Sequence, residues 1–170
     1  MIETHRLEIF PLTPADLELY LQAENKFEDA FALAYTGRIV APEVLKMVTG
    51  FTLPNMRNAA ADNYLFFTFW LVIEKASRTV VAELGFKGEP NTRHEVEIGY
   101  GTMPRRQGEG FMSEAVGGMI GWAKNRKDIA TILAETDQQN LPSIKVLRKN
   151  GFAQFDKRDN MLWWKINIPG

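Results

Sequence analysis

Hydrophobic residues in the first third of the chain follow more than one period. Residues 5–10 alternate between apolar and polar positions, which predicts a short strand. A threonine and a proline at 13–14 supply an N-cap and a first helical residue, so a helix is expected to follow. A further helix is predicted over residues 42–47. Three aromatic residues that recur every fourth position predict another helix, with an aromatic stripe that belongs to the core rather than to a cofactor site: Phe27, Phe31 and Tyr35.

From Leu65 onward the pattern changes to that of strands. The run LFFTFWLVIEK is continuously apolar and rich in aromatic and β-branched residues, which predicts a strand buried on both faces. Two more strands are expected over residues 79–86 and 95–103. The turns before them fall at 76–78 and 88–93, where small and polar residues gather.

The last third alternates helices and strands. Helices are predicted over residues 111–124 and 140–150, the second ended by Gly151. Strands are predicted over 130–136, 152–157 and 161–166. No linker or repeat interrupts the sequence, so we expect a single α/β domain (mixed α+β) over residues 1–170. Its sheet is expected to be mixed but mostly antiparallel, with about seven strands and helices on both faces.

Composition narrows the classes of protein to consider. With 45% hydrophobic residues, 24% charged residues and a net charge of -1, the chain is typical of a globular domain, and its balanced charges argue against nucleic-acid binding. It has no cysteine, which excludes disulfides, thiolate zinc sites and a cysteine nucleophile. His5 and His94 stand alone, so no metal site is expected. Without a signal-peptide profile or an apolar run of ~20 residues, we expect a cytoplasmic protein that does not span a membrane.

Residues 103–116, MPRRQGEGFMSEAV, lie between a predicted strand and a predicted helix. The glycines could simply form a turn that needs positive φ angles. In this position, however, the free backbone N–H groups of the helix start also form a natural anion site. A dinucleotide-binding loop would need a third glycine where Ser113 stands, and a Walker loop would need a lysine before that serine. Both of these alternatives fit poorly.

Two segments together resemble the core motifs of the GNAT acetyltransferases. They are VEIGYGTMPRRQGEGFMSEAV and ILAETDQQNLPSIKVLRKNGF, and the branch they resemble most is that of the ribosomal-protein N-terminal acetyltransferases (RimJ/RimL-like). The family pattern Gln/Arg-x-x-Gly-x-Gly/Ala falls on Gln107, Gly110 and Met112. The resemblance is close over residues 94–152, the expected cofactor-binding core, and looser over 1–24.

The resemblance implies an acetyl-CoA-dependent N-acetyltransferase acting on a primary amine of a small molecule or a protein N-terminus. The alternative is a non-catalytic acyl-CoA-binding module of the same fold. Either could be a monomer or a homodimer. The segment 27–63, where such enzymes shape the acceptor site, matches no familiar pattern. The residues expected to bind acetyl-CoA, with Glu109 pointing into solvent, are Thr102, Met103, Gln107, Gly108, Glu109, Gly110, Phe111, Met112, Ser113, Asn140 and Ser143.

The transfer needs a base, and the strand 95–103 offers Glu97. Family members often carry a catalytic glutamate at about this position. If the preceding hairpin turns around Pro90, Glu83 falls opposite Glu97 on the same sheet face. Two carboxylates about 5 Å apart would raise the pKa of one of them. Either glutamate could instead pair with a nearby Arg or Lys, and Glu135 or water could take its place.

The transfer also needs an acid for the departing thiolate. Asn140 is a favoured N-cap, and Ser143 can close the first helical turn, so both have structural explanations. Many members of the family use a tyrosine as the acid, but the matching position here is Leu147. In this branch the serine of Asn-x-x-Ser resembles a substitute, which makes Ser143 the candidate acid.

Overall fold

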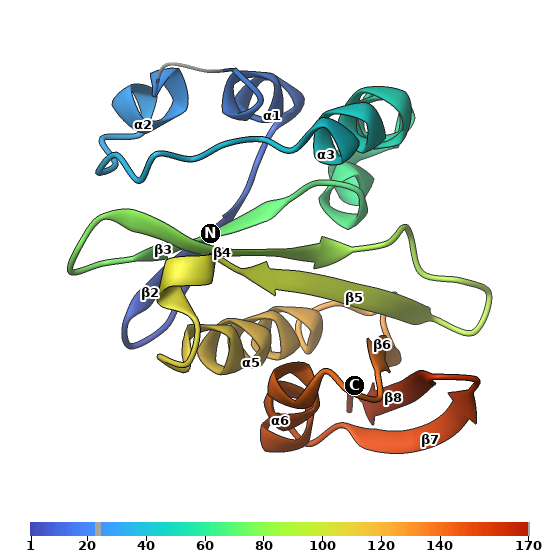
Figure 1. Cartoon of the computed structure of the whole chain (residues 1–170). Coiled ribbons are helices and arrows are strands. Elements are labelled where there is room, and N and C mark those ends of the chain that lie inside the picture. The colour runs from blue at the N-terminus through green and yellow to red at the C-terminus, as the bar shows by residue number, and fades with distance from the viewer. Residues whose placement is uncertain (23–24, 170) are drawn as a thin grey trace.

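The computed structural model describes residues 1–22 and 25–169, in which one mixed sheet lies between two layers of helices (Figure 1). The strands are β1 (Ile2–Glu3), β2 (Leu7–Pro11), β3 (Trp70–Glu74), β4 (Thr79–Phe86), β5 (Glu95–Thr102), β6 (Thr131–Asp137), β7 (Ala153–Arg158) and β8 (Met161–Asn167). The helices are α1 (Pro14–Tyr20), α2 (Lys26–Ala30), α3 (Pro42–Met47), α4 (Leu53–Asn58), α5 (Phe111–Ala123) and α6 (Leu141–Lys149). Short π or 3₁₀ turns are η1 (Val48–Thr52), η2 (Ala61–Phe66) and η3 (Pro104–Arg106).

The strands follow the order β1-β2-β3-β4-β5-β6-β8-β7. Neighbouring strands are antiparallel except β5 and β6, which are parallel. The predicted α/β fold with a mixed, mostly antiparallel sheet is therefore confirmed. The sheet has eight strands rather than about seven, because the two-residue β1 adds to the edge of β2.

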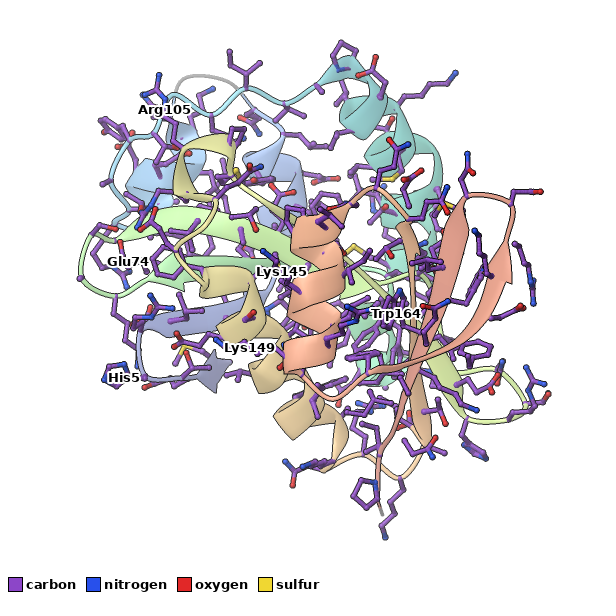
Figure 2. All side chains as sticks on the ribbon, turned by 60° about the horizontal axis from the view of Figure 1, so that its bottom comes forward. His5, Glu74, Arg105, Lys145, Lys149 and Trp164 are labelled. Carbon is purple, nitrogen blue, oxygen red and sulfur yellow. The ribbon has the colours of Figure 1, made fainter. Side chains whose placement is uncertain are left out.

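The sheet separates two hydrophobic clusters. Helices α1 to α4 cover one face, and α5 and α6 cover the other (Figure 1). On β3, Trp70 and Val72 belong to the cluster under α5, while Leu71 and Ile73 belong to the opposite one. Burial on both faces explains why β3 is apolar at successive positions. Figure 2 labels Trp164 of β8 beside α6, where its indole donates to Thr136 Oγ1 at 3.1 Å.

Of the N-terminal helices, α1 and α3 follow the sequence pattern, with α3 at the predicted bounds, whereas α2 is shorter than predicted. Thr13 caps α1 as predicted, and Asp16 completes a capping box with it. The aromatic stripe is only partly confirmed, because α2 ends at Ala30 and Ala32 adopts a positive φ of 50°. Phe27 is buried, but Tyr35 is 62% exposed, so its assignment to the core was wrong.

The strand predicted from Leu65 begins later, at Trp70. Residues up to Phe66 form η2 instead. The ring of Phe66 packs against Phe86 at 5.7 Å and Trp122 at 6.1 Å between centroids. This aromatic packing explains the apolar residues that the pattern assigned to a strand, since a short apolar run does not distinguish the two structures.

The pairing between β5 and β6 is brief, and it shapes the site. The two parallel strands pair only from Glu95 with Thr131 to Glu97 with Leu133. Beyond Glu97, β5 keeps its ladder with β4 alone. The sheet therefore opens between the ends of β5 and β6. In the described part of the chain, no helix has the length and apolar character needed to cross a lipid bilayer.

Candidate active site

The glycine loop ends at the N-terminus of α5. Gly108 and Gly110 have φ angles of 82° and 81°, a conformation that glycine adopts at little cost. A Cβ at Gly108 would meet nothing within 4 Å, so the loop is open on that side. The first N–H groups of α5 have no partner within the helix, and the helix dipole adds a partial positive charge. The loop therefore has the backbone geometry and the local charge that suit an anion.

Two arginines hold this loop in place, one through its backbone and one through the side chain of Glu109. Arg6 donates to the backbone carbonyl of Glu109 at 3.1 Å and pairs with Glu114 at 2.7 Å. Arg106 pairs with Glu109 at 2.9 Å, and both guanidinium groups lie over the ring of Phe111. The hydrogen bonds from Arg106 hold the pKa of Glu109 below its ordinary value. The side chain of Glu109 is exposed, as expected, and its charge is balanced by Arg106.

Two of the predicted cofactor residues, Phe111 and Met112, can act only through their backbone. The side chains of Phe111 and Met112 are buried. Thr102 pairs with Ala82 in the ladder, and the N–H of Met103 donates to Val81 at 2.9 Å. Phe111 and Met112 can offer a ligand the N–H groups of the first helical turn. The N–H of Met103 cannot serve in this way, because it is already hydrogen-bonded to Val81.

A small cavity of about 230 Å³ occupies the opening between β5 and β6. The carbonyl and N–H groups of β5 that face it have lost the partner strand, so a ligand with amide groups could hydrogen-bond there. In Figure 2, Lys145 and Lys149 lie on exposed positions of α6 on the side next to α5. The residues lining the cavity are Lys87, Ile98, Gly99, Tyr100, Glu135, Thr136, Asp137, Asn140, Ser143 and Met161.

Asn140 and Ser143 meet at the start of α6. The Asn140 Oδ1 accepts a hydrogen bond from the Ser143 N–H at 3.1 Å, so the predicted cap is present. The hydroxyl of Ser143 lies 2.9 Å from the hydroxyl of Tyr100 on β5. Burial raises the pKa of Tyr100, although its hydrogen bond with Ser143 acts in the opposite direction. The phenol therefore stays protonated at neutral pH and can donate a proton.

Sequence reasoning missed Tyr100. The family position for the acid lies on α6, where this chain has Leu147, which is buried in the core. The alternation of Val96, Ile98 and Tyr100 could have indicated it, because it places Tyr100 on the sheet face that α5 and α6 cover.

The predicted pair of carboxylates is wrong. Glu83 lies opposite Gly101 in the β4–β5 ladder, and the carbonyl of Glu97 accepts from the N–H of Lys87 at 2.9 Å. Four strand positions, about 13 Å, separate Glu83 from Glu97 along the sheet. They cannot raise each other's pKa by direct repulsion.

Lys87 lies between two carboxylates instead. Its ammonium contacts Glu97 and also pairs with Glu135 at 2.9 Å. Partial burial acts to lower the pKa of Lys87, but the two carboxylates outweigh it and hold that pKa above its ordinary value. This ion triad joins β5 to β6 at the point where their pairing ends. In the described ranges, no three His, Asp or Glu side chains are grouped as a metal site would need.

A larger groove of about 490 Å³ lies on the opposite sheet face, under α3 and η1. Glu83 lines it and accepts a hydrogen bond from the hydroxyl of Tyr20. Burial raises the pKa of Glu83, and the Tyr20 hydrogen bond and the charge of Arg38 oppose part of that rise. The groove and the small cavity share Lys87, Gly99 and Tyr100, so the two spaces meet at β5.

Comparisons with known proteins agree with this geometry. The family model described as an acetyltransferase (GNAT) domain matches residues 6–153. The uncharacterized N-acetyltransferase YjdG of Bacillus subtilis (strain 168) is 32% identical over 98 residues, which are 58% of this chain and 58% of that protein. The match thus spans little more than half the length of this relative.

Solved structures share the fold at low identity. A RimL ribosomal L7/L12 alpha-N-protein acetyltransferase in complex with coenzyme A has a TM-score of 0.63 and 18% identity, covering 97% of this chain and 96% of that one. The spermidine N-acetyltransferase of Vibrio cholerae has a TM-score of 0.66 and 11% identity, covering 97% and 95%. These neighbours do not single out one branch. Because the family model covers well over half of the residues, the chain belongs to the GNAT acetyltransferase family.

Proposed function

We propose that the protein is an acetyl-CoA-dependent N-acetyltransferase whose acceptor is a primary amine. The observation that carries this proposal is the position of the opening between β5 and β6. The anion loop follows directly after β5, and the small cavity and the larger groove meet at that strand. A donor bound along the opening would therefore reach an acceptor in the groove without a covalent enzyme intermediate.

Acetyl-CoA fits the residues that are present. The loop 107–110 and the first turn of α5 would hold the pyrophosphate, and Asn140 with the free edge of β5 would hydrogen-bond the pantetheine arm. The RimL structure that shares this fold contains coenzyme A, which supports acetyl-CoA as the ligand. When bound, acetyl-CoA supplies an acetyl group as a thioester. Within the family, the sequence motifs favour the RimJ/RimL-like branch, and we expect a cytoplasmic monomer or homodimer.

Acetyl transfer forms a C–N bond to the acceptor and breaks the C–S bond of the thioester. In the same reaction the ammonium nitrogen of the acceptor loses two protons. One of these protons ends on the thiol of coenzyme A and the other goes to solvent. Tyr100 and Ser143, whose hydroxyls are 2.9 Å apart, are placed to protonate the thiolate, with Ser143 as the group named from the sequence.

Two carboxylates compete for the role of base. Glu97, proposed from the sequence, is in contact with Lys87 and is not among the residues lining either cavity. Glu83 lines the groove directly and, among the described residues, has no Lys or Arg within salt-bridge distance. The groove therefore favours Glu83 as the group that removes a proton from the acceptor.

Release of free thiol from acetyl-CoA, measured across a panel of amines, tests the proposal. Amine-dependent thiol release and acetylated product are expected. The alternative function, a non-catalytic acyl-CoA-binding module, predicts acetyl-CoA binding without thiol release for any amine. A protein that binds no acetyl-CoA would refute both functions.

A further inference from the structure

The groove on the acceptor side is lined mostly by apolar side chains. They come from α3, η1 and the segment before β3: Met47, Phe51, Phe67 and Phe69. Phe51 is 54% exposed and Met47 is 45% exposed, and both border the same groove, which makes them more informative than scattered exposed apolar residues. They stand around a concave space rather than on a convex surface, as in sites that bind small apolar molecules.

Three glycines leave the floor of this groove without side chains. Gly85, Gly99 and Gly101 lie on one sheet face, with Gly85 paired to Gly99. A Cβ added at Gly101 would meet nothing within 4 Å, and one at Gly99 would make only an ordinary contact with the Lys87 side chain at 3.6 Å. The fold therefore does not need glycine at these two positions for packing. Their lack of side chains leaves room above the sheet.

The charge in the groove is a single uncompensated carboxylate. Among the described residues, the charged side chains that line it are Glu83 and Lys87. Lys87 contacts both Glu97 and Glu135, so its charge is more than balanced, and neither of these two carboxylates lines the groove. Tyr20 donates to Glu83 without adding charge.

A second cation near Glu83 is also neutralised. The guanidinium of Arg38 lies over the ring of Tyr20 at 4.1 Å and pairs with the buried Glu28 at 3.0 Å. Glu83 therefore lacks a full countercharge of its own. A partly buried carboxylate of this kind is suited to a cationic ligand.

We propose that the acceptor is a monovalent primary ammonium attached to an aromatic or branched aliphatic group. Its ammonium would pair with Glu83 and its apolar group would pack against Phe51, Phe67 and Phe69. This inference rests on the proposed function and gives it a substrate class. It assigns Glu83 both to ammonium recognition and to the removal of the first proton from nitrogen.

Other acceptors match this groove less well. A polyamine carries several charges, and a groove with one free carboxylate leaves the remaining charges next to aromatic side chains without an acidic partner. A peptide N-terminus brings backbone N–H and C=O groups, whose burial against apolar side chains costs free energy unless they are hydrogen-bonded. An arylalkylamine or a branched alkylamine has neither difficulty.

The test compares four amines at fixed acetyl-CoA: phenethylamine, isoamylamine, spermidine and an alanine-terminated tripeptide. We expect kcat/KM to be highest for the first two, with product identity confirmed by mass spectrometry. A preference for spermidine or the tripeptide would overturn the inference while leaving the proposed function intact. Calorimetric binding of phenethylamine to the protein saturated with coenzyme A provides a readout that does not depend on turnover. Phenethylamine binding without acetyl transfer to any of the four amines would refute the proposed function and the inference with it. Neither binding nor transfer of phenethylamine, in a protein that acetylates another amine, would refute the inference alone.

Two variants locate the site. Glu83→Gln keeps an acceptor for the Tyr20 hydroxyl but removes the charge, and it is expected to lower kcat/KM for phenethylamine by about 100-fold or more. Gly101→Leu fills the groove and is expected to lower the same kcat/KM at least about 10-fold. Glu83→Gln should leave acetyl-CoA affinity within about twofold, since Glu83 belongs neither to the loop nor to the free edge of β5. Glu43→Gln, an exposed change on α3 outside the lining, is the matched control. Wild-type phenethylamine kinetics in folded Glu83→Gln would reject Glu83 as the ammonium partner.

Discussion

Replacing Gly110 tests the cofactor loop most directly. Its φ angle of 81° costs an L-residue about 1–2 kcal/mol relative to glycine. The nearest atom to an added Cβ is Arg6 Nη2 at 3.6 Å, an ordinary contact, so Gly110→Ala meets no steric clash. The variant must either keep the loop and lose that free energy of unfolding, or shift the loop and turn its N–H groups away from the anion. Gly110→Val, being β-branched, should favour the second outcome.

The loss of affinity can be estimated from the hydrogen bonds. A hydrogen bond to a charged group contributes about 1.5–3 kcal/mol, so losing one should weaken acetyl-CoA binding about 10- to 100-fold. Calorimetry of acetyl-CoA binding and thermal unfolding measure the two effects separately. The matched control is Gly121→Ala, which lies on the exposed side of the same helix with nothing within 4 Å. It should add up to about 1 kcal/mol of stability and leave affinity unchanged. A folded Gly110→Val protein with wild-type affinity would show that the loop does not hold the pyrophosphate.

Three further predictions concern the other polar groups. Glu97→Gln is expected to lower kcat no more than about tenfold, because Glu83 supplies the base; a fall of about 10²–10⁴-fold would return that role to Glu97. Tyr100→Phe and Ser143→Ala should each lower kcat while changing acetyl-CoA affinity little. If the two hydroxyls act as a unit, the double variant should be no slower than the slower of the two single variants. Glu28→Ala removes the carboxylate that pairs with Arg38 in a largely buried site, so it should lower the free energy of unfolding by about 3 kcal/mol. Denaturant titration measures this change. An unchanged midpoint would mean that the ion pair contributes nothing to stability.

The local features of the site were predictable because each depends on a few neighbouring residues. A strand followed by QGEG and a helix indicated two positive φ angles, and Gly108 and Gly110 have them. The Asn140 cap followed from residue type and position. These structures are determined by backbone geometry within one turn, where sequence patterns are most informative.

The relative placement of Glu83 and Glu97 was not predictable because it depends on the hairpin register. The prediction centred the turn on Pro90. In the structure, Asn91 Oδ1 accepts from the N–H groups of Arg93 and Glu95, at 2.8 and 3.1 Å, and this side-chain network moves the register. A strand ladder shifts as a whole with its turn, so a small error there displaced Glu83 from Glu97 by four positions.

The contact between Tyr100 and Ser143 could not be predicted from the sequence for a different reason. The two residues are 43 positions apart and come from β5 and α6. Their contact requires that β5 and β6 separate beyond Glu97, so that the start of α6 can approach the end of β5. The sequence motif points to an acid on the helix, whereas tertiary packing brings a phenol from the sheet to the same place.

Stability and function should conflict at Glu83, and the pH dependence of unfolding can reveal it. Burial raises the pKa of Glu83 above its value in the unfolded chain, so ionising this group costs folding free energy. The cost is absent below the unfolded pKa, where both states are protonated, and complete above the raised folded pKa. Glu83→Gln removes the charge but keeps the acceptor for Tyr20. Its melting temperature should therefore exceed that of the wild type near pH ~8 and match it near pH ~4, the unperturbed range of glutamate. A variant less stable than the wild type at the higher pH would mean that the charged carboxylate stabilises the fold, and Glu83 would then be a structural residue rather than one kept for the acceptor.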